Sequence, residues 1–170
     1  MEHRRRLVLV RHAKAEPFAS TDHARTLTER GSRDAGATGR YLASTGVRPD
    51  HALVSSAARA VGTWERMADA AGWRLGPVVD QSVYNGSYEV VLEALGAVPG
   101  DASVVCFVGH NPTVSFLAHF LEDGKGDAAV ADAMMRGFPT GAVAVLGTDR
   151  AWDDLGQESA RLVDFHVGRG

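Results

Sequence analysis

Five short apolar runs stand out along the chain, separated by longer segments in which apolar residues recur with helical spacing. The runs occupy residues 6–12, 51–56, 102–110, 140–147 and 160–167. A short, nearly continuous apolar run bounded by charged or turn residues is typical of a strand buried on both faces. A weaker strand, followed by an Asn-Gly turn, is expected within residues 76–87.

The intervening segments predict helices, because their apolar residues recur three and four positions apart. The helices are expected at residues 28–44, 58–71, 88–96 and 112–121. Ser87 is a candidate cap for the third helix, and Asn111 and Pro112 fit the N-cap and first position of the fourth. Residues 122–137 are rich in glycine and aspartate, and their sequence leaves open whether they form a lid or a surface helix.

The alternation of strands and helices predicts an α/β fold with a mostly parallel sheet. No repeat, linker or low-complexity segment divides the sequence, so residues 1–170 are expected to form a single domain. In sheets of this kind, ligands bind beyond the carboxyl ends of the strands. The residues that follow each strand are therefore the first candidates for a functional site.

Cationic or imidazole side chains follow three of the predicted strands. Arg11 and His12 end the first, Arg59 lies in the helical turn after the second, and His110 ends the strand at 102–110. Each residue alone could be a rim charge, a cap or a packing residue. Because the ends of parallel strands meet at one edge, where two helix N-termini also point, we expect a pocket for a small dianion such as phosphate.

Composition narrows the class of protein. The formal net charge of −3 gives no broad basic surface for nucleic acid or anionic lipid, so anion binding has to be local. Cys106 is the single cysteine, which excludes an internal disulfide and fits a reducing compartment. The apolar run near the N-terminus is too short for a signal peptide or a membrane span. We therefore expect a cytoplasmic protein that binds neither nucleic acid nor membrane.

Several other chemistries lack their sequence signatures. Cys106 has Pro112 six residues later, where a cysteine phosphatase needs arginine, and the G-x-S-x-G and P-loop patterns are missing. Five other histidines lack the spacing of metal ligands and are treated as surface or packing residues: His3, His23, His51, His119 and His166. We therefore expect no metal and no cofactor. A histidine nucleophile needs neither, because a neutral imidazole can attack phosphorus directly.

Three segments together resemble the signature of the histidine phosphatase superfamily, which includes the cofactor-dependent phosphoglycerate mutases. They read "LVLVRHAKAEP" (7–17), "SSAARAVGTWE" (55–65) and "VVCFVGHNPTV" (104–114). The stretches "RTLTERG" (25–31) and "VYNGS" (83–87), together with the modest length, are most similar to the small SixA-type phosphohistidine phosphatases. The resemblance spans residues 7 to about 147.

This resemblance implies a three-layer α/β/α sandwich of the phosphoglycerate mutase type and a phosphohistidine intermediate. By the matching positions, His12 would be the nucleophile, Arg11 and Arg59 would bind the phosphoryl oxygens, and His110 would hydrogen-bond the phosphate. One departure is Ala13, where the signature usually has glycine. A methyl group there should not block the pocket if the backbone angles are ordinary.

The larger departure concerns the general acid. Larger family members carry a glutamate after a short strand between the second and third segments, and the stretch "SVYNGSYE" (82–89) has no acid at that strand end. Glu89 is a candidate acid, although its position near a helix start fits better a residue that complements the helix dipole. Asp22 and Glu16, in the loop after His12, are further candidates.

A missing acid favours a phosphoramidate over an alkyl phosphate ester as substrate. Protonated phosphohistidine can leave as neutral imidazole, so it does not depend on an enzymic proton donor. We therefore expect a metal-independent phosphatase that acts on phosphohistidine in a protein. Two alternatives stay open: a phosphatase of a small phosphorylated metabolite, and a non-catalytic module that binds phosphate.

Overall fold

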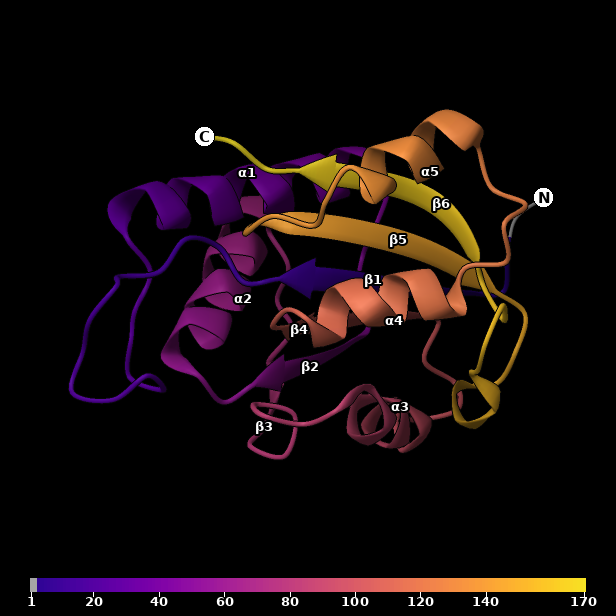
Figure 1. The fold of residues 1–170 in the computed structure, drawn as a ribbon, viewed down its shortest axis with the longest axis horizontal. Helices are drawn as coiled ribbons and strands as arrows, with labels where there is room; N and C mark the ends of the chain where they lie inside the picture. The colour runs from indigo at the N-terminus through magenta and orange to yellow at the C-terminus, as the bar shows by residue number, and fades with distance from the viewer. Residues whose placement is uncertain (1–2) are drawn as a thin grey trace.

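The computed structural model describes residues 3–170 and centres on a six-stranded sheet (Figure 1). Its strands are β1 (Arg5–Arg11), β2 (His51–Ser55), β3 (Val78–Asp80), β4 (Val104–Gly109), β5 (Ala142–Thr148) and β6 (Arg161–Val167). In space the order is β3-β2-β4-β1-β5-β6. Strands β1 to β4 are mutually parallel, β5 runs against β1, and β6 runs against β5. The mostly parallel sheet expected from the sequence is confirmed.

Helices cover both faces of this sheet (Figure 1). On one face, α1 (Glu29–Ser44) and α2 (Ala58–Ala71) pack against each other, while α3 (Tyr88–Gly96) and α4 (Thr113–Leu121) cover the other face. The segment 122–137 contains α5 (Ala128–Met135), which packs against the edge strand β6. These layers confirm the α/β/α sandwich. No helix within residues 3–170 is long and apolar enough to cross a membrane.

Strand β1 shows why its sequence is continuously apolar. Leu7 and Leu9 belong to the core under α3 and α4, whereas Val8 and Val10 belong to the core under α1 and α2. All four side chains are fully buried. Successive side chains of a strand point to opposite faces, so a strand covered by helices on both sides needs an apolar residue at every position.

The register of the central strands brings their carboxyl ends together. Arg11 of β1 lies opposite Gly109 of β4, and Val54 of β2 lies opposite Val108 of the same strand. The residues that follow β1, β2 and β4 therefore emerge side by side at one edge. This edge is where the sequence predicted a site.

The element boundaries agree with the sequence expectations to within two residues, but two helix caps differ. Helix α4 begins at Thr113, so Pro112 rather than Asn111 occupies its capping position, and the expected cap is wrong by one residue. Asn111 still serves the helix start, because its Oδ1 accepts a hydrogen bond from the backbone N–H of Ser115 at 3.3 Å. Ser87 precedes α3 as expected, but its side chain accepts no capping hydrogen bond.

Helices α1 and α2 approach each other closely at Gly39. A Cβ added there would lie 2.2 Å from the carbonyl oxygen of Met67, so we expect Gly39→Ala to force the two helices apart. Overpacking of this kind should lower the free energy of unfolding, measured in urea, by about 1–3 kcal/mol.

Gly36, one turn earlier on α1, provides a matched control. Its added Cβ would approach the flexible tip of Arg40 at 3.4 Å and no backbone atom of α2. Alanine is also the better helix former, so Gly36→Ala should be neutral or stabilising by up to about 1 kcal/mol. Equal losses in the two variants would contradict the close approach at Gly39.

Candidate active site

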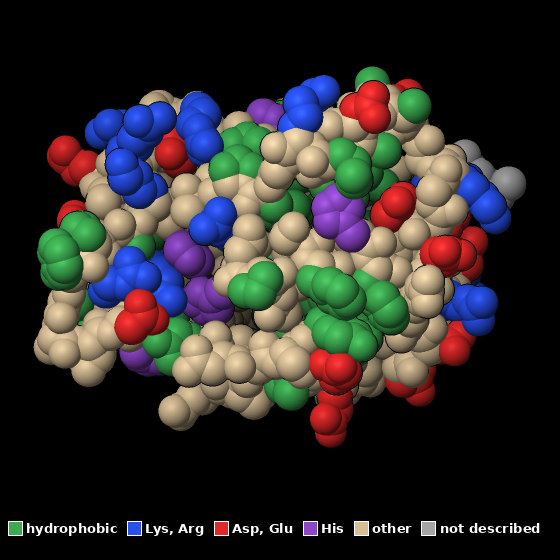
Figure 2. Space-filling model, in the orientation of Figure 1, with side chains coloured by type: hydrophobic (Ala, Val, Ile, Leu, Met, Phe, Trp, Pro, Cys, Tyr) green, Lys and Arg blue, Asp and Glu red, His purple; other side chains and the backbone are tan. Residues whose placement is uncertain are grey.

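The four residues predicted for the phosphate pocket come together at the carboxyl edge of the sheet. Arg11 is the last residue of β1, and His12 and His110 directly follow β1 and β4. Arg59 lies in the first turn of α2, with its Nε 3.3 Å from Nε2 of His12. The ring centroids of His12 and His110 are 5.2 Å apart. Figure 2 shows histidine side chains beside Lys and Arg side chains near this end of β1.

The ring of His12 is held in one tautomer. Its Nδ1 lies 2.8 Å from the carbonyl oxygen of Ala13. A carbonyl can only accept a hydrogen bond, so Nδ1 carries the proton and Nε2 keeps a free lone pair. Burial lowers the pKa of His12 to about 4, and the nearby arginines, Arg59 foremost, act in the same direction against the Ala13 hydrogen bond. His12 is therefore a neutral imidazole at neutral pH.

Arg59 presents its Nε–H to this lone pair because its two terminal nitrogens are held elsewhere. Its side chain is only 7% exposed. Nη1 donates to the backbone oxygen of Asp22 at 2.8 Å, and Nη2 donates to the carboxylate of the same residue at 3.0 Å. Asp22 thus accepts hydrogen bonds from both terminal nitrogens of the guanidinium, and the Nε–H is directed to His12.

The Asp22 carboxylate accepts hydrogen bonds from three side chains. Besides Arg59, the Tyr84 hydroxyl donates to its Oδ2 at 2.5 Å, and Arg25 donates to its Oδ1 at 2.9 Å. The hydrogen bonds from Tyr84 and then Arg25 hold the pKa of the Asp22 carboxyl well below its usual range. An ionised carboxylate of this kind does not supply protons near neutral pH. In this arrangement Asp22 anchors Arg59.

Arg11 is fixed by the segment before β5. Its Nη1 donates to the carbonyl oxygen of Phe138 at 3.0 Å, and the Asn111 side chain donates to the same oxygen at 2.9 Å. The backbone N–H of Gly141 also donates to the carbonyl oxygen of His12 at 3.1 Å. The Nε of Arg11 is buried without a hydrogen-bond partner. This N–H is a donor that no acceptor among the described residues uses.

His110 completes the pocket from the end of β4. Its Nε2 lies 2.7 Å from the hydroxyl of Ser55, and its Nδ1 is buried without a partner. Burial lowers the pKa of His110 to about 3, and the neighbouring His12 and Arg59 act in the same direction. Both histidines are therefore neutral, and the fixed positive charge of the pocket comes from its arginines.

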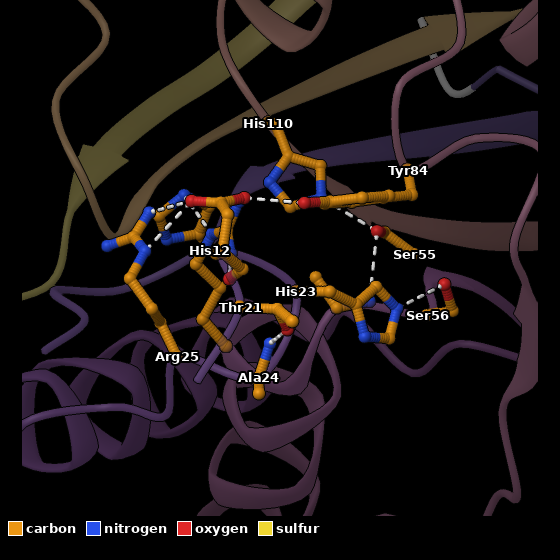
Figure 3. Close-up of polar contacts among 12 residues, drawn as sticks. His12, Thr21, His23, Ala24, Arg25, Ser55, Ser56, Tyr84 and His110 are labelled. Carbon is orange, nitrogen blue, oxygen red and sulfur yellow. Dashed lines mark hydrogen bonds and ion pairs between the residues drawn. The ribbon is translucent and has the colours of Figure 1, made fainter. Parts of the chain in front are cut away.

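Tyr84 and His23 form one wall of the site. The sequence did not assign Tyr84 to the site, and it indicated a surface or packing role for His23. Tyr84 lies edge-on to the His110 ring, with centroids 5.6 Å apart, and to the His23 ring at 4.9 Å (Figure 3). His23 in turn hydrogen-bonds the Ser56 hydroxyl at 2.9 Å. The sequence signal that could have indicated Tyr84 is its position in the stretch "VYNGS", one of those that resemble the SixA-type enzymes.

The other acid candidates, Glu89 and Glu16, are exposed carboxylates. Glu89 is exposed in the first turn of α3, where hydrogen bonds, the largest from Ser87, lower its pKa. These are the contacts of a residue that complements a helix dipole. Glu16 is also exposed, in the loop after β1. Among residues 3–170, no group of three or more His, Cys, Asp or Glu residues is arranged to hold a metal ion.

The arrangement suits a small dianion. Three arginines, Arg11, Arg25 and Arg59, and one carboxylate, Asp22, surround two neutral imidazoles, so the pocket has a positive balance. Charge-assisted hydrogen bonds from guanidinium groups to phosphate oxygens are strong and geometrically specific. The chemistry on offer is phosphate binding beside an unprotonated, nucleophilic nitrogen.

Known proteins are similar to this chain in sequence. The model of the family described as "Histidine phosphatase superfamily (branch 1)" matches residues 7–83. An uncharacterized protein of Mycobacterium tuberculosis is 37% identical over 162 residues, which cover 94% of this chain and all of that relative.

Solved structures extend the similarity to the whole fold. A candidate phosphohistidine phosphatase SixA from Nakamurella multipartitia matches with a TM-score of 0.84 and 35% identity, covering 96% of each chain. Another from Agrobacterium tumefaciens has a TM-score of 0.79 and 30% identity, covering 98% of this chain and 99% of that one. This chain is therefore a phosphatase that belongs to the histidine phosphatase superfamily, in its SixA-type branch.

Proposed function

We propose that this phosphatase, acting as one domain over residues 1–170, removes the phosphoryl group from phosphohistidine in a protein substrate. His12 is the nucleophile, and Arg11, Arg59 and His110 bind the phosphoryl group. The observation that carries the proposal is the neutral Nε2 of His12, with its lone pair 3.3 Å from the Nε of Arg59. Before substrate binds, the Nε–H of Arg59 lies beside this lone pair.

In the first step, Nε2 of His12 attacks phosphorus and the P–N bond to the substrate ring breaks. The Nε–H of Arg59, beside Nε2, donates a hydrogen bond to a phosphoryl oxygen, and Arg11 and His110 donate to the others. The substrate ring leaves as neutral imidazole. The positive charge then rests on the phosphorylated His12 ring, whose Nδ1–H remains on the Ala13 carbonyl.

In the second step, water attacks phosphorus and the bond to Nε2 breaks. Inorganic phosphate takes up the proton that the water loses, and His12 returns to its neutral Nδ1–H form. Both steps develop charge on the phosphoryl oxygens, so donors fixed before the reaction stabilise the transition state. The anchoring of Arg59 by Asp22 supports this role, because it leaves the guanidinium little freedom to reorient.

The choice of phosphohistidine rests on the missing proton donor. Asp22 is ionised and Glu89 is exposed in the first turn of α3, so we expect an alkoxide leaving group to find no acid in the pocket. The similarity to the Nakamurella and Agrobacterium proteins, both candidate phosphohistidine phosphatases, supports the same substrate class. We further propose a cytoplasmic location, because the free thiol of Cys106 fits a reducing compartment.

His12→Ala is expected to remove hydrolysis, with a loss of at least about 10³-fold, because the nucleophile is gone. Wild-type protein incubated with a phosphohistidine protein should form an acid-labile phosphoenzyme that maps to His12 by mass spectrometry. His119→Ala, which removes an exposed histidine of α4, should keep wild-type turnover. Phosphate binding by the wild type without turnover would instead indicate the non-catalytic module.

Substrates should separate according to their leaving groups. We expect turnover of a phosphohistidine protein to exceed that of an alkyl phosphate such as glycerol phosphate by about 10²-fold or more, the usual contribution of a general acid. Steady-state phosphate release measures both, and Glu89→Gln should change neither. Faster hydrolysis of alkyl phosphates would indicate a phosphatase of small metabolites, with a general acid other than Asp22 or Glu89.

The mechanism requires a neutral His12 over the working pH range. Because burial lowers the pKa to about 4, the ring should stay neutral from pH 8 down to about pH 5 and take up its proton near pH 4. Titration of the ¹⁵N-labelled histidine rings by NMR measures this midpoint, and the urea-unfolded chain, with histidines near 6.5, is the reference. A midpoint near 6.5 in the folded protein would contradict the proposed neutral nucleophile.

A further inference from the structure

A buried hydroxyl lies behind His110, on the side away from His12. Ser55 is the last residue of β2, and its side chain is fully buried. Its Oγ lies 2.7 Å from Nε2 of His110 and also accepts a hydrogen bond from the backbone N–H of Ala57 at 3.4 Å. Figure 3 shows His110 with one nitrogen directed to Ser55 and the other turned toward the side of the pocket that holds His12.

The direction of the hydrogen bond follows from counting donors and acceptors. If Nε2 carried the proton, the hydroxyl hydrogen of Ser55 would lack an acceptor and Nδ1 of His110 would be a second buried group without a partner. If Ser55 donates, the hydroxyl is satisfied, and only the Nδ1–H of His110 lacks a partner. Leaving a buried polar group unpaired costs about 1–3 kcal/mol, so the second arrangement is favoured.

We propose that Ser55 is a positioning residue, which holds His110 in the Nδ1–H tautomer so that this nitrogen donates to the phosphoryl group. The assignment rests on the proposed function for its catalytic consequence. A neutral imidazole has one donor and one acceptor, and the bond made by one nitrogen decides which role the other has. In the opposite tautomer, a lone pair would face the phosphoryl oxygens and repel them.

The burial of His110 makes this control necessary. Burial, and after it the neighbouring His12 and Arg59, lowers the pKa of His110 to about 3, so the ring cannot become a donor at both nitrogens by taking up a second proton at neutral pH. The free imidazole side chain prefers the Nε2–H form, which is the wrong one here. A hydroxyl fixed at the end of a central strand reverses that preference without adding charge.

NMR of the ¹⁵N-labelled histidine rings tests the assignment directly. In wild-type protein, His110 should show a protonated Nδ1 and an unprotonated Nε2. Ser55→Ala should exchange the two signals or average them. Ser56→Ala, which removes the neighbouring hydroxyl bonded to His23, should leave the His110 signals unchanged. A wild-type ring protonated at Nε2, or an unchanged ring in Ser55→Ala, would overturn the proposal.

Inorganic phosphate then serves as the probe of the donor role. Adding it should shift the Nδ1–H signal of His110 in the wild type, and kcat for the phosphohistidine protein should fall about 10- to 100-fold in Ser55→Ala. Ser55→Thr, which keeps the hydroxyl, should restore the tautomer and most of kcat, and it also covers the case in which Ser55→Ala fails to fold. Equal losses of kcat in Ser55→Thr and Ser55→Ala, with the wild-type tautomer of His110 kept in both, would overturn the proposal.

These readouts also separate the two proposals. The tautomer and its dependence on Ser55 are measured on the resting protein and do not require turnover. If wild-type protein hydrolyses no phosphohistidine substrate but its His110 tautomer follows Ser55, the proposed function fails and the tautomer assignment stands.

Discussion

A buried guanidinium keeps its charge at any physiological pH, so it needs hydrogen-bond acceptors around it. Arg59 is such a guanidinium, and the residues of the pocket have to supply its acceptors. Asp22 supplies a backbone oxygen and a carboxylate, and Tyr84 and Arg25 hold that carboxylate in place. The loop after β1 is thereby tied to the start of α2. With its terminal nitrogens engaged, Arg59 offers its Nε–H to His12, so the orientation of one cation organises both the loop and the ring of His12.

Burial, and after it the positive charges of Arg59 and Arg11, lowers the pKa of both histidines and keeps them neutral. Neutrality gives each ring one donor and one acceptor, and the fold decides which nitrogen has which role. The Ala13 carbonyl takes the proton of His12 at Nδ1, and Ser55 lies at Nε2 of His110. Two identical side chains, with ring centroids 5.2 Å apart, thus differ in the nitrogen that can donate, which suits the different roles we propose for them.

Much of the fold was predictable from the apolar pattern. The runs that became β1 and β4 are continuously apolar because helices cover both of their faces, and the rule that parallel strands end together led from those runs to Arg11, His12, Arg59 and His110. The start of α4 was placed one residue early, since a proline can sit at or just before the first helical position. Cap positions depend on local hydrogen bonds, which residue types alone do not decide.

The sequence by itself determined the sheet, its layers and the four residues that the strand ends bring together. A strand buried on both faces is apolar at every position, and such a run is visible in the sequence. Only the tertiary structure decided the roles of Asp22, Tyr84 and Ser55. Their contacts join segments dozens of residues apart, Tyr84 to Asp22 and Ser55 to His110, and no periodic pattern records such pairs. Asp22 illustrates the difference: by type it could be an acid, and its three donors make it an anchor.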